Sequence, residues 1–138
     1  MKKIILLAFI IIIAIHIAGN FFGWYEAVPW LDIPMHIAGG AWVGLLFFYV
    51  FGVRKKIFNS GNNFYFLICG LGFAALIGVL WEFYEFAMDI LIWKSYTPWA
   101  TPGHIHFDTL IDLFNDLIGA FVAIVLLLIF SRKNSKNT

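Results

Sequence analysis

The chain has 138 residues, of which 62% are hydrophobic and 12% charged, and its mean hydropathy is +0.90. This composition excludes an ordinary soluble domain and indicates an integral membrane protein built as one domain. The net charge of +1 says little as a total, and nothing in the sequence suggests a nucleic-acid partner. The partner we expect is therefore the lipid bilayer.

Four apolar runs have about the length of a bilayer crossing, at about residues 4–19, 35–52, 64–81 and 109–130. They predict an all-α fold, an integral membrane four-helix bundle. We expect a single transmembrane domain over residues 1–131 and a disordered basic tail over 132–138. The first run resembles a secretory signal peptide, but no small-x-small cleavage site follows it, so we expect it to remain as a helix.

The basic residues predict the orientation of the helices. Lys2, Lys3, the segment 54–56 and the tail that starts at Arg132 carry nearly all the positive charge, and an even number of spans puts these places on one side. The positive-inside rule makes that side cytoplasmic. We therefore predict a multi-pass protein of the bacterial cytoplasmic (inner) membrane with both termini inside.

The connecting segments on the other side differ in character. GNFFGWYEAVPWLDIP combines aromatic residues with prolines and is expected to lie in the headgroup layer with a short turn. The third apolar run continues through WEFYEFAMDILIW without a helix breaker, which predicts a helix of about 30 residues. KSYTPWATPGHIHF contains breakers and is expected to be a loop carrying His104 and His106, whose role the sequence leaves open.

Polar residues recur at helical spacing in three of the four runs, and small residues continue each stripe. The stripes are Asp32, His36, Gly40 and Gly44; Gly70, Ala74, Gly78, Glu82 and Glu85; and Asp108, Asp112, Asp116 and Ala120. Small residues at this spacing let helices approach closely. At about 1.5 Å per residue, the polar parts of the stripes reach one depth in the outer half of the membrane. We expect them to converge.

Mutual salt bridges cannot neutralise such a cluster, because all 8 acidic residues fall in the outer half while nearly every base is cytoplasmic. Either some carboxylates hold protons or a cation lies among them. Carboxylate and imidazole ligands suit a divalent metal cation, whose identity the sequence does not define. The predicted catalytic residues are His36, Glu82, Glu85, Asp112 and Asp116. The predicted metal ligands are His36, Glu82, Asp112 and Asp116, and the residues expected to support them are Asp32, Asp108 and Asn115.

A structural role competes with the chemical one at several of these positions. Polar side chains join membrane helices by hydrogen bonds without further chemistry. Charges prefer water, so Glu26, Asp89 and Asp108 are expected to be solvated at the membrane surface. His16 and Asn20, four residues apart near the end of the first helix, are expected to pack rather than to belong to the site.

Three motifs in a fixed order, DIPMHIAGG, WEFYEF and DTLIDLFNDLIGA, resemble the pattern of the YjdF-like bacterial inner-membrane proteins of unknown function and, more distantly, of the VanZ-like proteins. The resemblance covers roughly residues 30–121. It marks as signature positions Asp32, His36, Glu82, Glu85, Asp108, Thr109, Asp112, Asp116, Gly119 and Ala120. The chain departs from the pattern at Ile37, where Phe is frequent, and at Leu110, where Gln is common. The VanZ-like resemblance implies a link to the cell envelope and to glycopeptide antibiotic tolerance.

The function we expect is that of a cation-dependent enzyme acting on an envelope lipid or lipid-linked substrate, with a site that opens outward between the last three helices. A proton or cation carrier is an alternative, and so is a non-catalytic accessory protein of the envelope. The lack of a recognised nucleophile weighs against the enzyme, and the position of the carboxylates near one surface weighs against the carrier. The substrate and the oligomeric state stay open.

Overall fold

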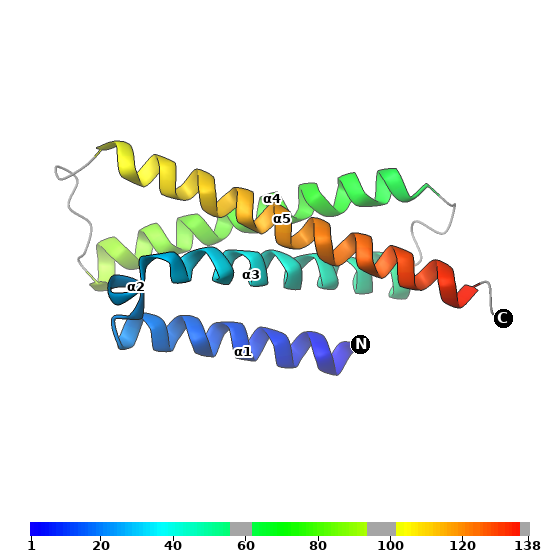
Figure 1. Ribbon diagram of the computed structural model, residues 1–138, viewed down its shortest axis with the longest axis horizontal. Helices are drawn as coiled ribbons and strands as arrows, with labels where there is room; N and C mark the ends of the chain where they lie inside the picture. Colours follow the sequence, from blue (N-terminus) through cyan, green and yellow to red (C-terminus); the bar gives the residue numbers. More distant parts are fainter. Residues whose placement is uncertain (56–61, 94–101, 136–138) are drawn as a thin grey trace.

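The computed structural model describes residues 1–55, 62–93 and 102–135, and the regular structure in these ranges is helical throughout (Figure 1). The elements in chain order are α1 (Lys2–Phe21), α2 (Trp24–Ala27), η1 (Pro29–Leu31), α3 (Asp32–Phe47), η2 (Phe48–Arg54), α4 (Asn63–Met88), η3 (Asp89–Trp93) and α5 (Pro102–Ser135). The segments η2 and η3 are wider π-helical turns that continue α3 and α4. The all-α prediction is therefore confirmed.

Within the described ranges, four helices are long and apolar enough to cross a membrane, at Lys2–Phe21, Pro29–Arg54, Asn63–Ile92 and Phe107–Ser131. This agrees with the predicted multi-pass arrangement, and the third span has 30 residues, as its uninterrupted apolar run predicted. The start of α1 and the end of α5 lie toward one end of the bundle (Figure 1), as an even number of spans requires.

The prediction of a loop around His104 and His106 was wrong, because both residues belong to α5, which begins at Pro102. Proline is tolerated in the first turn of a helix, where its missing N–H would have had no partner. The side chains of these two histidines lie outside the part that the structure describes. At its other end α5 runs to Ser135, past the predicted domain end at residue 131, and residues 136–138 are outside the described ranges.

The connection between α1 and α3 folds back tightly through α2 and η1, which confirms the predicted short turn. Gly23 makes this possible with a φ of 68°, in the left-handed region that favours glycine. Trp24 and Trp30 are both exposed on this connection, at 42% and 67%. Their exposure fits the interfacial position expected of tryptophan in a membrane protein.

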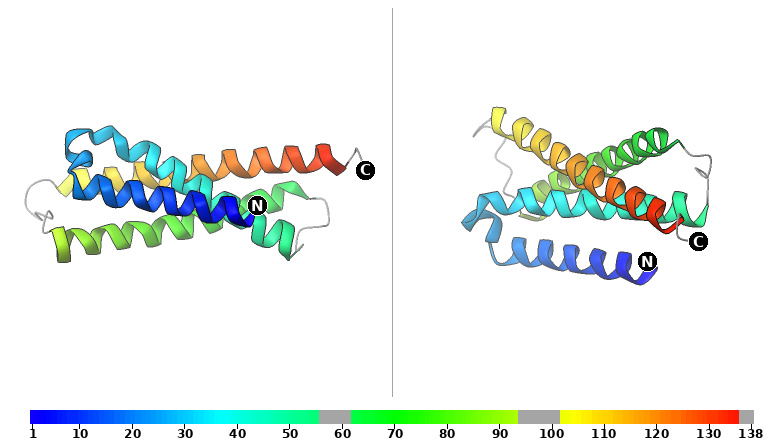
Figure 2. Two further views of the ribbon diagram at one scale, coloured as in Figure 1. Left: turned by 90° about the horizontal axis from the view of Figure 1, so that it is seen from below. Right: turned by 45° about the vertical axis from the view of Figure 1, so that its right-hand side comes forward.

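The closest helix pair is α3 with α5, which crosses α3 and α4 obliquely (Figures 1 and 2). A Cβ added at Gly40 would meet the backbone of Asp116, and one added at Gly119 would meet the backbone of Ile37. Lipid tails are as apolar as the helices themselves, so such association depends on close packing rather than on a hydrophobic force. Glycine is thus required at this crossing, which lies beside the polar stripes.

The end of the bundle nearest the start of α4 is filled by an aromatic cluster. Phe47, Phe48, Phe66 and Ile124 are buried there, and the Phe47 and Phe66 ring centroids are 5.0 Å apart. Such an aromatic pair stabilises a fold by about 0.5–1.5 kcal/mol beyond the area that it buries. This half of the bundle is a packed apolar core, which confines the polar residues to the other half.

Helix α1 is the least embedded of the four spans, with 11% of its apolar window buried against 33% in the second span. It lies along α3 (Figures 1 and 2). The Trp42 Nε1–H donates a hydrogen bond of 2.8 Å to the Ile5 carbonyl, and the Trp42 ring packs on Phe9 with centroids 4.8 Å apart. Near its other end, α1 contacts α4 through the His16 and Trp81 rings. This loose packing leaves room for the cavities described below.

Candidate functional site

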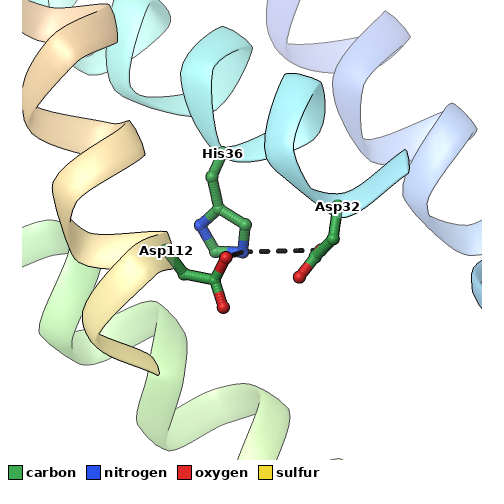
Figure 3. Close-up of side chains that lie close together, drawn as sticks. All are labelled: Asp32, His36 and Asp112. Carbon is green, nitrogen blue, oxygen red and sulfur yellow. Dashed lines mark ion pairs between the residues drawn. The ribbon is translucent and has the colours of Figure 1, made fainter. Parts of the chain in front are cut away.

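His36 lies at the centre of a ring of carboxylates. Its side chain points from α3 toward Asp32 on the same helix and Asp112 on α5 (Figure 3). The Nε2 atom is 3.6 Å from Asp32 Oδ1, 3.8 Å from Asp112 Oδ1 and 3.9 Å from Glu85 Oε2. The Nδ1 atom is 3.4 Å from Asp116 Oδ1. Four carboxylates from three helices therefore face one buried imidazole.

The small residues of the three stripes bring these side chains together. Asp116 is held beside His36 because its backbone packs against Gly40 on α3. A Cβ added at Gly78 on α4 would lie 2.6 Å from Asp116 Oδ2. Gly40 thus leaves the space that the Asp116 backbone occupies and Gly78 the space that its carboxylate occupies, and the predicted convergence of the small and polar stripes is confirmed.

The spacing of the donor atoms suits a cation. Asp32, His36 and Asp112 each offer one ligand atom, and these three atoms lie within 4.8 Å of one another. The same holds for His36, Glu82 and Glu85. Divalent cations bind oxygen at about 2.0–2.6 Å, so donors on opposite sides of one ion are about 4–5 Å apart. Here the His36 cluster means these five residues together with Asp116. Oxygen donors with one imidazole match a hard or borderline divalent metal.

The His36 cluster has an excess of negative charge and an unmet hydrogen-bonding demand. No lysine or arginine in the described ranges forms an ion pair with Asp32, Glu85, Asp112 or Asp116, whose only ion-pair partner there is His36. Glu82 Oε1 is buried without a hydrogen-bond partner. A buried polar atom without a partner costs about 1–3 kcal/mol. A bound cation would satisfy both the charge and the oxygen.

Two cavities meet at the cluster. A polar cleft of about 590 Å³ is lined by residues that include Tyr25 and the acidic side chains of Asp32, Glu85, Asp89 and Asp108. An apolar cavity of about 100 Å³ extends deeper between the helices. The side chains that line this apolar cavity include Phe9, Ile12, Ile13, Val43, Ile77 and Trp81. Asp32, Glu85 and His16 line both.

The structure brings together all the side chains that were predicted to be catalytic or metal-binding: His36, Glu82, Glu85, Asp112 and Asp116. Of the supporting residues, Asp32 joins the cluster. Asp108 is exposed in the polar cleft, and Asn115 is buried with its Nδ2 atom lacking a partner. Glu26 and Asp89 are exposed, as expected of solvated charges. The chemical roles of these residues stay predictions.

A second polar group at the cleft was not predicted. His16 Nδ1 lies 3.2 Å from the Tyr25 hydroxyl, and Asn20 Nδ2 lies 3.2 Å from His16 Nε2. Burial and the nearby charges of Asp32 and Glu85 raise the pKa of Tyr25 to about 12, so this hydroxyl keeps its proton. The spacing of His16 and Asn20 by four was visible in the sequence, but nothing there indicated that Tyr25 folds back onto them.

Comparison with known protein families matches the chain to a family of membrane proteins. A family model described as a predicted membrane protein, DUF2238, covers residues 1–133 and thus nearly the whole chain. This confirms the YjdF-like resemblance at the level of the family, while the VanZ-like relation stays a prediction. No curated protein and no solved structure matches the chain.

Proposed function

The chain belongs to the DUF2238 family of predicted membrane proteins, and we propose that its His36 cluster binds a divalent cation and acts on an envelope lipid or lipid-linked substrate. The observation that carries this proposal is the position of His36, within 3.9 Å of carboxylates from three helices. Ionisable residues inside a membrane span are costly and mark ion or substrate sites. The adjoining polar cleft reaches the cluster at Asp32 and Glu85.

The residues divide naturally between holding a cation and moving a proton. His36, Asp112, Asp116 and Glu82 would hold the cation, because they supply the imidazole, two buried carboxylates of α5 and the buried Glu82 Oε1 that has no hydrogen-bond partner. A bound divalent cation would polarise a phosphoryl or carbonyl oxygen of the substrate. Glu85 lines both the cleft and the apolar cavity, as do Asp32 and His16, and we assign to it the transfer of a proton to or from a bound substrate.

The shape of the bundle favours an enzyme over a carrier. A transport path has to reach from the site to the opposite membrane surface. The cluster of Phe47, Phe48, Phe66 and Ile124 fills the bundle interior beyond the polar half. The polar cleft instead lies beside α1 at the site's own end, and the apolar cavity continues from it along α1 as far as Phe9 and Trp42. These features support a site that receives its substrate from one leaflet.

We place the polar half in the outer leaflet of a bacterial cytoplasmic membrane, with both termini cytoplasmic, because the bases gather at the opposite end. Single cysteines replacing Glu26 and Lys55, both exposed, test this orientation after the exposed Cys69 is changed to serine. An impermeant maleimide applied to intact cells is expected to label Glu26→Cys, and to label Lys55→Cys only after permeabilisation. The reverse pattern would invert the orientation.

Turnover can be tested with the full chain reconstituted in vesicles of bacterial envelope lipid and supplied with Mn²⁺. Mass spectrometry of the lipids is expected to show a new species with wild type and none with Asp112→Asn, because that variant loses a cluster carboxylate. Glu26→Gln, which removes an exposed charge outside the cluster, should retain full turnover. Unchanged lipids with wild type, or Mn²⁺ accumulating inside the vesicles, would contradict an enzymatic role.

A further inference from the structure

The hydrogen bonds around His16 fix which atoms carry protons. Asn20 Nδ2 donates to the His16 backbone carbonyl at 3.0 Å, and a carbonyl can only accept, so the orientation of this amide is determined. The same Nδ2 atom lies 3.2 Å from His16 Nε2, which must then be the acceptor nitrogen. A neutral ring with Nε2 accepting carries its proton on Nδ1. His16 therefore donates to the Tyr25 hydroxyl.

The proton of the Tyr25 hydroxyl is consequently left for another acceptor. The Tyr25 ring packs on α1, where a Cβ added at Gly19 would lie 2.7 Å from a ring carbon. The ring is thus held in place beside the polar cleft, which Tyr25 lines and whose charged lining in the described ranges is acidic. The Tyr25 hydroxyl is an uncharged donor, so the carboxylates of the cleft do not pair with it as they would with a lysine or arginine. It can therefore donate to an oxygen of a ligand.

The apolar cavity indicates what else the ligand carries. It continues from the cleft at His16, Asp32 and Glu85, and its deeper walls are formed by Ile12, Ile13 and similar side chains. A ligand that fills both spaces has a headgroup at the mouth and an apolar chain between the helices. Its entry is eased by α1, the least embedded of the four spans.

We propose that Tyr25, positioned by His16 and Asn20, binds a headgroup oxygen of an amphiphile whose apolar chain occupies the cavity beside α1. This assignment rests on the proposed function, since it names the substrate class of the same site. The shared chemistry is an oxygen acceptor on an ester or phosphate headgroup. An uncharged headgroup needs only the Tyr25 donor, whereas a phosphate in this acidic cleft also needs the cation.

Two probes distinguish a headgroup that needs only the Tyr25 donor from one that also needs the cation. They are monolauroylglycerol, used without metal, and dodecyl phosphate, used with Mn²⁺. Their binding to the detergent-purified full chain is measured by native mass spectrometry. Tyr25→Phe keeps the ring that packs on Gly19 and removes only the hydroxyl, so it is expected to weaken both probes about tenfold. Asn20→Ala should also lower the affinity for both probes, because Asn20 orients His16 and His16 in turn positions the Tyr25 hydroxyl. It should leave the affinity for Mn²⁺ unchanged.

Tyr84→Phe is the matched control, since Tyr84 lines the same cleft but packs its ring on Trp81. It should bind both probes like wild type. Ile13→Trp, which fills the cavity, should weaken both probes while Mn²⁺ binding persists. Equal affinities of wild type and Tyr25→Phe, or equal losses in Tyr25→Phe and Tyr84→Phe, would overturn the assignment. A chain that binds no Mn²⁺ but shows the Tyr25-dependent affinity for monolauroylglycerol would refute the cation site alone.

Discussion

Replacing Gly40 with alanine is expected to lower the free energy of unfolding by about 1–3 kcal/mol, the usual cost of overpacking a tightly packed interior. A Cβ at this position would meet the backbone of Asp116, which cannot rotate away as a side chain can. Because α5 must shift, Asp116 moves from His36, and the affinity for Mn²⁺ should fall about tenfold or more. Unfolding in a denaturing detergent followed by circular dichroism measures the stability loss.

Gly72→Ala is the control for the intrinsic effect of alanine in a helix. A Cβ added at Gly72 has nothing within 4 Å, so this variant should be neutral or gain about 0.5–1 kcal/mol from the lost flexibility of glycine. Its Mn²⁺ affinity should equal that of wild type. If Gly40→Ala and Gly72→Ala were equally stable, the close crossing of α3 and α5 would not hold.

Asp112→Asn and Glu82→Gln are each expected to weaken Mn²⁺ binding by about tenfold or more, because affinity at such sites depends on the number of charged ligands. In chelator the same variants should be as stable as wild type or more stable, since each removes one of several carboxylates that repel each other. Paramagnetic resonance titration gives the affinity, and thermal unfolding in chelator gives the stability.

Glu26→Gln removes the same charge from an exposed position outside the cluster and should leave both quantities unchanged. If Asp112→Asn and Glu82→Gln instead lost stability in chelator while wild type bound no metal, the carboxylates would be protonated hydrogen-bond donors between helices. That result would favour the purely structural role that polar residues have in many membrane bundles.

The helices and the cluster could be predicted because both depend on periodic patterns. Length and hydropathy determine a membrane span, and intervals of four put His36, Gly40 and Gly44 on one face. The small size of the side chains in these stripes predicted that the helices meet there. The close approach of Gly40 to the Asp116 backbone agrees with this prediction. The helical rise of about 1.5 Å per residue then predicted that the polar residues of three helices lie at the same depth in the membrane.

The remaining features depend on tertiary contacts that no single segment encodes. Pro102 signalled a loop, but proline also starts helices, and only the packing of α5 distinguishes these outcomes. The position of Tyr25 follows from the left-handed turn at Gly23, which folds the ring back onto the space beside Gly19. The loose packing of α1, and hence the cavities beside it, is likewise a property of the assembled bundle.

The most direct test of the cation site is elemental analysis of the detergent-purified wild-type chain after dialysis against Mn²⁺, together with thermal unfolding with and without chelator. The site predicts a stoichiometry near one cation per chain, bound among the carboxylates around His36, and a lower unfolding midpoint once the chelator removes it. A chain that retains no metal and whose unfolding midpoint no divalent cation raises would contradict it.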